Sequence, residues 1–409
     1  MDLFLSAPNF STLRCTHPYR SPAPLRSRIF TVRSSSLPFP IQKAKYYREL
    51  QAAVGVVERA CRLCLDVKSS LFSYDERIIE KNDQTPVTVA DFGVQALVSL
   101  ELGKLFPSIP LVAEEDSAFL RTNNLADPVV NAVIGSSSSV DKSWTKADVL
   151  EAIDRGGEDA FAFGTRPATY WVLDPIDGTR GFLKGTEALY VVGLALIVDG
   201  EIELAVMGCP NWQEDLANRP TPDVQEFENI LSESGIVMVA HRGCGTWAKR
   251  LSFEQQTTIS VPSRWTRCSV DYYSLVHEAR FCIPESQTWD SLPLSALFSA
   301  TTDADSVGDN QILLLPKCCG SLCKYLMVAS GRASVFILRS RVQKTIKAWD
   351  HAAGIICVHE AGGQVTDWKG NQIDLSADQT GRRIIFPSGG VVVTNGNLHN
   401  QIIEMTSFD

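Results

Sequence analysis

Two carboxylates flank a proline in the segment Asp174–Thr179, whose letters are DPIDGT. The segment follows the short apolar run Tyr170–Leu173, and the ends of strands are where a rigid scaffold presents reactive groups. Pro175 fixes part of a bend, so Asp174 and Asp177 can converge on one point. Carboxylates held so close repel each other unless a cation lies between them, and Mg²⁺ prefers oxygen ligands. The segment alone is equally compatible with a metal site and with an ordinary turn that starts a helix.

Three other carboxylates lie where a predicted element begins or ends. Glu114 follows a short apolar run, Asp91 follows the letters TPVTVA, and Asp350 lies in the letters WDHAAG. Taken singly, Glu114 has an ordinary explanation as a solvated helix start, and Asp91 and Asp350 as caps of helix amides. Together with the central segment, these positions favour one shared site over separate coincidences.

The elements that must position these residues mix helix and strand along the whole chain. Helical spacing of apolar residues predicts helices over residues 46–65, 91–105, 149–153 and 352–360. Apolar and β-branched runs predict strands over residues 170–173, 190–197, 202–207, 236–240 and 391–394. Residues 121–165 are interpreted as an excursion that holds only the short helix. The pattern predicts an α/β layered architecture, with domains over residues 46–265 and 266–409.

The first 45 residues have a composition of their own. From Leu3 to Lys45 there is no acidic residue, while five arginines lie among serines and prolines. This composition cannot bury a core and predicts a disordered organellar transit peptide over residues 1–45. A secretory signal would need an apolar stretch of about 7 to 15 residues, which is missing. A disordered tail that stays attached is the alternative; plastid and mitochondrial signals share this chemistry, and Thr31–Ser36 weakly favours plastid.

The bulk properties exclude some classes of protein. A chain of 409 residues is long enough for two domains, and its net charge of −9 argues against non-specific nucleic-acid binding. No apolar run approaches the roughly 18 to 20 residues that cross a bilayer. The eleven cysteines are scattered without zinc-site spacing, which favours reduced and mostly buried thiols, with a redox role for one pair left open. We therefore expect neither nucleic acid nor a membrane as partner, whereas an anionic substrate is compatible with this charge, because acidic residues that hold divalent cations make an occupied site electropositive. No feature predicts an oligomeric state.

Four segments resemble one known family when they are taken together. They are TPVTVADFGVQ, LVAEEDS, WVLDPIDGTRGFLKG and KAWDHAAGIICVHEAGGQVTD, and they are similar to the motifs of the inositol monophosphatase superfamily of lithium-sensitive, Mg²⁺-dependent phosphatases. Within it, the chain looks closest to the 3'(2'),5'-bisphosphate nucleotidases, the PAP phosphatases of plants and fungi. The resemblance covers most of the chain after residue 45. It implies a layered α/β/α/β/α sandwich of two domains, like inositol monophosphatase and fructose-1,6-bisphosphatase, with metals between the domains.

The resemblance also implies roles for individual residues. The metal ligands would be the side chains of Glu114, Asp174, Asp177 and Asp350 and the backbone carbonyl of Ile176. They would hold two to three Mg²⁺ ions, spaced roughly 3.5 to 4 Å apart, which polarise the phosphate and the attacking water.

Asp91 and Thr179 would orient and deprotonate that water. Threonine alone is too weak a base, so it would relay a proton towards the carboxylate. The implied reaction is in-line hydrolysis of a phosphomonoester without a phospho-enzyme.

The substrate contacts that the resemblance implies are Thr179, Ser321, Lys324, Arg339 and Asp350. Ser321 and Lys324 lie in the letters SLCKY, which resemble the family segment SQxKY. Lys324 would hold the second, non-reacting phosphate as a point charge, unless it is an ordinary exposed helix lysine. Arg339 follows by one residue the position, Leu338, that aligns with a family arginine. A slip of one residue reverses the face of a strand, so equivalence requires a bulge or an alignment gap.

The chain departs from the family at two other places. The family has a histidine near the adenosine, whereas Pro284–Asp290 contains none. Trp289 in that stretch either stacks on a base or belongs to the core. Lys344–Lys347, before WDHAAG, also differs from the close relatives.

Three functions are compatible with the sequence. The first is an organellar phosphatase that converts adenosine 3',5'-bisphosphate (PAP) to AMP and phosphate, with PAPS as a further substrate. The second is a phosphatase for an inositol polyphosphate or a sugar phosphate. The third is a non-catalytic relative that binds a phosphorylated metabolite, against which the complete pair Asp91 and Thr179 argues.

Overall fold

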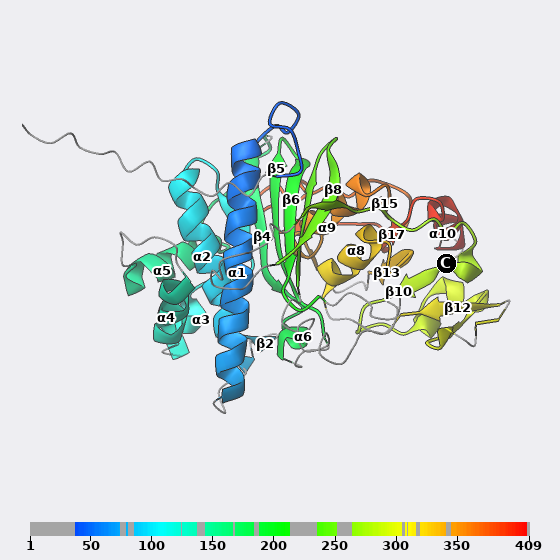
Figure 1. Ribbon diagram of the computed structural model, residues 1–409, viewed down its shortest axis with the longest axis horizontal. Helices are drawn as coiled ribbons and strands as arrows, with labels where there is room; N and C mark the ends of the chain where they lie inside the picture. Colours follow the sequence, from blue (N-terminus) through cyan, green and yellow to red (C-terminus); the bar gives the residue numbers. More distant parts are fainter. Residues whose placement is uncertain are drawn as a thin grey trace, which may run out of the picture. The chain divides into compact units, whose positions relative to one another are not determined.

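Two β-sheets organise the chain in the computed structural model (Figure 1). It describes residues 37–73, 79–80, 86–123, 125–136, 144–166, 168–183, 188–212, 235–251, 264–304, 307–308, 310–315, 320–340 and 345–406. The larger sheet has seven strands in the order β3 (Leu111–Ala113), β4 (Thr169–Asp177), β5 (Val191–Val198), β6 (Glu201–Cys209), β7 (Ile236–His241), β8 (Gly245–Arg250) and β9 (Thr266–Arg267). The smaller has six in the order β11 (Ser299–Thr301), β12 (Gln311–Leu314), β10 (Arg280–Cys282), β13 (Val335–Arg339), β17 (Gly390–Thr394) and β15 (Gln364–Asp367). Two short pairs join β1 (Ile79–Glu80) to β2 (Pro86–Val87) and β14 (Ile346–Lys347) to β16 (Ile384–Ile385).

The helices lie in layers around these sheets. They are α1 (Tyr47–Ser73), α2 (Val89–Leu105), α3 (Ala118–Asn123), α4 (Ala126–Ser136), α5 (Lys146–Asp154), α6 (Thr179–Leu183), α8 (Ser321–Ala329), α9 (Trp349–Glu360) and α10 (His399–Thr406). Three short 3₁₀ helices, η2 (Val276–Glu278), η3 (Trp289–Ser291) and η4 (Pro293–Ala296), accompany the smaller sheet. None of the described helices combines the length and apolar character that crossing a bilayer requires.

Alternation along β4 separates two hydrophobic cores. Trp171 and Leu173 pack with residues of α1 and α2, whereas Val172 packs with residues of α8 and α9 on the other face. Figure 1 shows α1 and α2 on one side of the larger sheet and α8 and α9 between the two sheets. A third core lies between the smaller sheet, η3, η4 and α10. The predicted α/β/α/β/α sandwich is therefore confirmed.

The predicted elements agree with the structure where apolar spacing is strong. Helices over residues 46–65, 91–105 and 352–360 correspond to α1, α2 and α9, and the predicted strands to β4, β5, β6, β7 and β17. Asp199 and Gly200 form the hairpin turn between β5 and β6, with φ angles of 53° and 87°.

The excursion predicted over residues 121–165 is wrong in part. Besides α5, this region contains α4 and the end of α3. Val129 and Val133 of α4 are fully buried against Phe92 and Ala96 of α2, so a few well-spaced apolar side chains suffice to dock the helix.

The segment Leu37–Lys45 is part of the fold, which corrects the prediction of disorder over residues 1–45. Leu37, Phe39 and Ala44 are buried in the core that α1 shares with the sheet. The ring of Phe39 lies 6.0 Å from that of His241, and His241 Nε2 donates to the carbonyl of Lys45 at 2.6 Å. Residues 1–36 of the predicted transit peptide lie outside the described residues.

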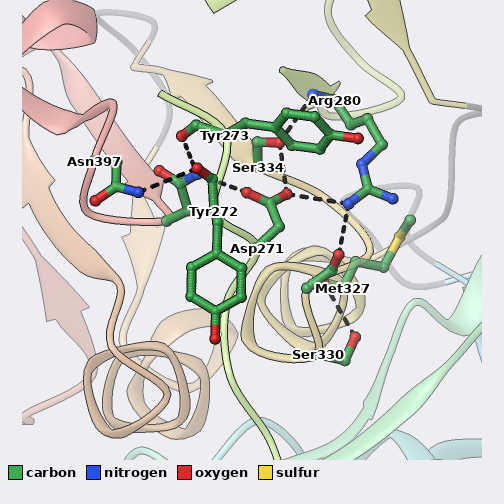
Figure 2. Close-up of polar contacts among 10 residues, drawn as sticks. Asp271, Tyr272, Tyr273, Arg280, Met327, Ser330, Ser334 and Asn397 are labelled. Carbon is green, nitrogen blue, oxygen red and sulfur yellow. Dashed lines mark hydrogen bonds and ion pairs between the residues drawn. The ribbon is translucent and has the colours of Figure 1, made fainter. Parts of the chain in front are cut away.

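Asp271 fixes the chain where it enters the smaller sheet (Figure 2). Its Oδ2 accepts hydrogen bonds from Ser334 Oγ at 2.7 Å and Arg280 Nη2 at 3.2 Å, and its Oδ1 accepts from Asn395 Nδ2 at 2.6 Å. A carboxylate so buried is stable because both oxygens have partners. β9 still belongs to the larger sheet, and residues 37–409 form one unit by their contacts, so the division into domains at residue 265 stays a prediction.

Candidate active site

Three carboxylates from distant parts of the chain meet at the end of β4. Asp174, Asp177 and Asp350 each offer an oxygen, and these oxygens lie within 4.8 Å of one another. The register between β4 and β5 shifts between Asp174 and Asp177, and this bulge brings both side chains to one point. Asp350 enters from the first turn of α9, whose N-cap residue is Ala348.

The electrostatics of this cluster mark it as a place for a cation. Burial raises the pKa of Asp174 well above its usual value, and Asp177, Glu114, Asp350 and Asp91 raise it further. All the predicted carboxylates therefore lie within electrostatic reach of Asp174.

One oxygen of the cluster is left without a protein partner. Among the described residues, the buried Asp174 Oδ1 has no hydrogen-bond partner. An all-oxygen donor set with such an orphaned oxygen fits a hard cation such as Mg²⁺.

Asp91 uses its two oxygens for two different purposes. Oδ2 accepts from the backbone N–H of Thr88 at 2.8 Å and from its hydroxyl at 2.6 Å, which completes the capping box of α2. Oδ1 lies 3.1 Å from Thr179 Oγ1, which also lies 3.1 Å from the carbonyl of Ile176. Asp91 therefore both caps α2 and makes the predicted contact with Thr179.

Asp177 links the larger sheet to α8. The backbone N–H groups of Ser321 and Cys323 donate to its two oxygens at 2.9 and 3.2 Å. Gly320, with a φ of 76°, precedes the helix, and a Cβ there would clash with this carboxylate. Burial raises the pKa of Asp177 to about 6, although Lys324 and these amides act in the opposite direction.

Lys324 is not the exposed helix lysine of the alternative interpretation. It is buried, and its Nζ donates to the carbonyl of Gly320 at 2.6 Å. It therefore places a positive charge beside Asp177.

The sequence analysis did not single out Tyr325 and His351, although each adjoins a predicted site residue. Tyr325 Oη and His351 Nδ1 lie 2.8 Å apart, and both side chains are fully buried between α8 and α9. Burial lowers the pKa of His351 to about 3, so this hydrogen bond joins neutral groups. The signal was present, because each residue adjoins a motif position, Lys324 or Asp350.

Comparison with known proteins agrees with this geometry. The model of the inositol monophosphatase family matches residues 45–408. The chain belongs to the inositol monophosphatase family. Members of the family are generally Mg²⁺-dependent phosphatases.

Relatives within the family carry more specific names. An Arabidopsis thaliana protein provisionally named a mitochondrial 3'(2'),5'-bisphosphate nucleotidase is 62% identical over 97% of this chain and 96% of its own. The 3',5'-bisphosphate nucleotidase AHL of the same plant is 35% identical over 87% of this chain and 95% of its own. The extragenic suppressor protein suhB of Bartonella henselae shares the fold, with a TM-score of 0.54 and 17% identity over 88% of this chain and 99% of its own.

One family-derived expectation, Arg339 as a substrate contact, gains no support from the geometry. Arg339 Nη1 donates to the carbonyl of Ser291 at 2.6 Å, and its guanidinium lies 5.9 Å from the ring of Trp368. The register of β13 against β17 runs without a shift from Val335 to Arg339, so of the two ways to make Arg339 equivalent to the family arginine, the bulge is absent from this strand and the alignment gap is untested. Arg339 as a substrate contact stays a prediction.

Trp289 belongs to the core, which was one of the two interpretations of this residue. It is 6% exposed, its Nε1 donates to the carbonyl of Phe298 at 2.8 Å, and its ring packs edge-on against Phe281. A buried indole with a satisfied N–H is not available to stack on a base.

A cavity of about 1270 Å³ opens beside Glu114. Its wall includes Phe119, Phe161, Lys347 and Arg383. Solvent therefore reaches the carboxylate region of this family member from the side of Glu114.

Proposed function

We propose that this chain is a Mg²⁺-dependent 3'(2'),5'-bisphosphate nucleotidase that hydrolyses PAP to AMP and phosphate. The names of the relatives at 62% and 35% identity support this substrate. The observation that carries catalysis is the contact of Thr179 Oγ1 with Asp91 Oδ1 at 3.1 Å, next to the cluster of Asp174, Asp177 and Asp350. PAPS, which carries the same 3'-phosphate, is proposed as a second substrate.

The proposed ligands fit the cation in chemistry and in charge. Two to three Mg²⁺ ions would be held by Glu114, Asp174, Asp177, Asp350 and the carbonyl of Ile176. When bound, Mg²⁺ would neutralise phosphate oxygens and make a nearby water easier to deprotonate.

Thr179 and Asp91 would handle the water. An attacking water donates a hydrogen bond to Thr179 Oγ1, whose own proton points to Asp91 Oδ1. As the water oxygen forms its bond to phosphorus, its proton passes to Thr179 and the threonine proton passes to Asp91. The bond from phosphorus to the 3'-oxygen breaks, and this oxygen takes a proton from solvent. Asp91 would accept this proton at Oδ1, the oxygen that already faces Thr179, whereas Oδ2 is bonded by Thr88.

Ser321, at the start of α8, and Lys324 would contact the phosphate that does not react. Lys324 lies within electrostatic reach of Asp177, so a phosphate held at this end of α8 would be close to the metal ligands. Thr179 and Asp350 would contact the reacting phosphate.

A phosphatase for an inositol polyphosphate or sugar phosphate is the second candidate. It is favoured by one observation, namely that Arg339, an expected substrate contact, and Trp289, whose alternative role was to stack on a base, both make contacts within the protein. A non-catalytic role is disfavoured by the complete pair Asp91 and Thr179.

We propose an organellar location, in a mitochondrion or plastid. The mitochondrial name of the Arabidopsis thaliana relative favours the mitochondrion. Fusing residues 1–36 to a fluorescent protein in plant cells tests this, and a diffuse cytosolic signal would contradict it.

The function is tested by measuring phosphate release with Mg²⁺ from PAP and from inositol 1,4-bisphosphate. The chain lacking residues 1–36 is the suitable protein, because Leu37 and Phe39 belong to the core. We expect kcat/KM for PAP to exceed that for the inositol compound by about 100-fold or more. A site whose polar groups bind the nucleotide would leave those groups unpaired with a substrate that has no nucleoside. Hydrolysis of the inositol compound with PAP left intact would overturn the proposed substrate.

A further inference from the structure

Lys68 is a buried lysine of α1 that lies on two aromatic rings. Only 8% of the surface of Lys68 is exposed. Its Nζ lies 5.4 Å from the ring centroid of Phe182 and 4.9 Å from that of Tyr190. The two rings meet edge to face, with centroids 5.0 Å apart and planes at 90°. A cation over two ring faces recovers part of the attraction that it loses with its hydration.

Both rings belong to segments that adjoin the proposed catalytic residues. Phe182 lies in α6, three residues after Thr179. Tyr190 directly precedes Val191, the residue that pairs with Asp177 across the two strands. The ammonium of Lys68 therefore lies against two segments that adjoin the proposed reaction centre.

The short helix α6 needs such an anchor. It has five residues, and its first turn is held by the N–H groups of Gly181 and Phe182, which donate to Gly178 O at 2.7 and 3.0 Å. A helix this short is not stable by itself, so tertiary packing sets its direction. The direction of α6 in turn sets where the Thr179 hydroxyl lies relative to Asp91 on α2.

A second observation connects Lys68 with Asp91. Cys64 lies one helical turn before Lys68 and is fully buried. Burial raises the pKa of Cys64, Asp91 raises it further and Lys68 lowers it. Cys64 thus lies within electrostatic reach of both Asp91 and Lys68.

We propose that Lys68 is a positioning residue for the phosphatase reaction, which holds α6 through Phe182 and Tyr190 and so fixes Thr179 against Asp91. The proposal rests on the proposed roles of Thr179 and Asp91. Lys68 lies outside the four segments that resemble the family motifs.

The test compares two substitutions of Lys68 with one matched control. Lys68→Met keeps the length and removes the charge, and Lys68→Arg keeps the charge and the contact with the rings. Lys249→Met is the control, because Lys249 Nζ also lies 4.9 Å from a ring, that of Trp265, and pairs with Glu58 at 2.7 Å, away from α6.

We expect the substitution Lys68→Met, made in the full chain, to lower kcat for PAP rather than to raise KM. Lys68→Met should lower kcat about 30-fold with KM within about twofold, because a misplaced reacting group slows the step without weakening binding. Lys68→Arg should recover most of kcat, and Lys249→Met should leave it unchanged. Equal kcat values in Lys68→Met and Lys249→Met would overturn the proposal.

Hydrogen exchange of α6 gives a second readout that needs no substrate. The amides of Gly181 and Phe182 should exchange faster in Lys68→Met than in the wild type, Lys68→Arg or Lys249→Met. Unchanged exchange in Lys68→Met overturns the positioning role whether or not PAP is hydrolysed. If the wild type leaves both phosphorylated substrates intact, the proposed function fails while the exchange result still decides whether Lys68 holds α6.

Discussion

The ends of β4 and β13 hold charged side chains in opposite ways. At the end of β4, Asp174 keeps a buried oxygen that has no hydrogen-bond partner among the described residues. At the end of β13, Arg339 donates to Ser291 and lies over Trp368, and its backbone N–H and C=O are both bonded by the side chain of Gln287. A charge left unsatisfied by the protein is available to a ligand, whereas a satisfied charge must first lose its partners. The contrast separates side chains held for a ligand from side chains held for the fold.

The largest expected effect is the replacement of Asp174. Asp174→Asn should lower turnover of PAP about a thousand-fold or more, because it removes a charged ligand from the centre of the proposed Mg²⁺ site. Asp271→Asn is the matched control, since Asp271 is also buried but has partners for both oxygens. That variant should lose stability and keep its turnover with saturating PAP; similar turnover in the two variants would remove the distinction between the two kinds of charge.

The second-largest expected effect is the removal of the Thr179 hydroxyl. Thr179→Ala should lower kcat about 100-fold, since positioned proton transfer typically contributes that much or more. Thr179→Ser keeps the hydroxyl and should stay within about tenfold of the wild type. Steady-state kinetics with PAP check this, and a serine variant as slow as the alanine variant would show that the methyl group, and not the hydroxyl, is what matters.

Burial of Asp177 predicts how the metal-free protein responds to pH. The pKa of Asp177 is raised from 3.8 to about 6, so between these values the folded chain binds more protons than the unfolded chain. Stability of the metal-free protein should therefore fall as pH rises from about 4 to about 6, by roughly 1 to 3 kcal/mol.

Asp174→Asn should weaken the dependence of stability on pH, because it removes a second carboxylate whose pKa is raised by burial and by the carboxylates crowded around it. Thermal unfolding in a chelator should show the variant more stable than the wild type above about pH 6 and no more stable near pH 4. Mg²⁺ should raise the midpoint of the wild type at neutral pH and have little effect on the variant. A wild type that is the more stable of the two at pH 7.5 without metal would contradict the crowding argument.

The smallest expected effect concerns Arg339. Arg339→Met should change KM for PAP less than about threefold, because its guanidinium is engaged by the protein, and should lower the unfolding midpoint by a few degrees. Arg332→Met is the control, since Arg332 also lies over an indole ring, that of Trp212, at 4.2 Å. An increase in KM of about tenfold or more in Arg339→Met alone would return Arg339 to the substrate contacts.

Local sequence was sufficient to predict that the carboxylates of the candidate site lie at the ends of strands and the starts of helices. Asp174 and Asp177 lie in one short segment, and Asp91 and Asp350 each lie in the first turn of a helix that apolar spacing predicts. In such places the backbone alone determines where the side chain is presented. The bulge between Asp174 and Asp177 was not predicted, although the proline suggested a bend.

Long-range packing decides the rest, and the sequence carries little trace of it. Whether Arg339 reaches a ligand depends on the register of β13 against β17, and whether Trp289 stacks on a base depends on the core that Phe281 shares with it. Lys68 gives no motif signal, because its role arises from rings that are more than a hundred residues away in sequence. The helix α4 was missed for a related reason, since few apolar residues dock it.

The packed segment Leu37–Lys45 limits how far the chain can be shortened from its N-terminus. A cut after residue 45 would remove the buried Leu37, Phe39 and Ala44 and uncover the rings of His241 and Trp247, against which Phe39 rests. Such a shortened chain would expose apolar surface and be prone to associate with itself. A shortened chain that keeps this core intact would therefore have to retain Leu37, so the proposed transit peptide would end before that residue.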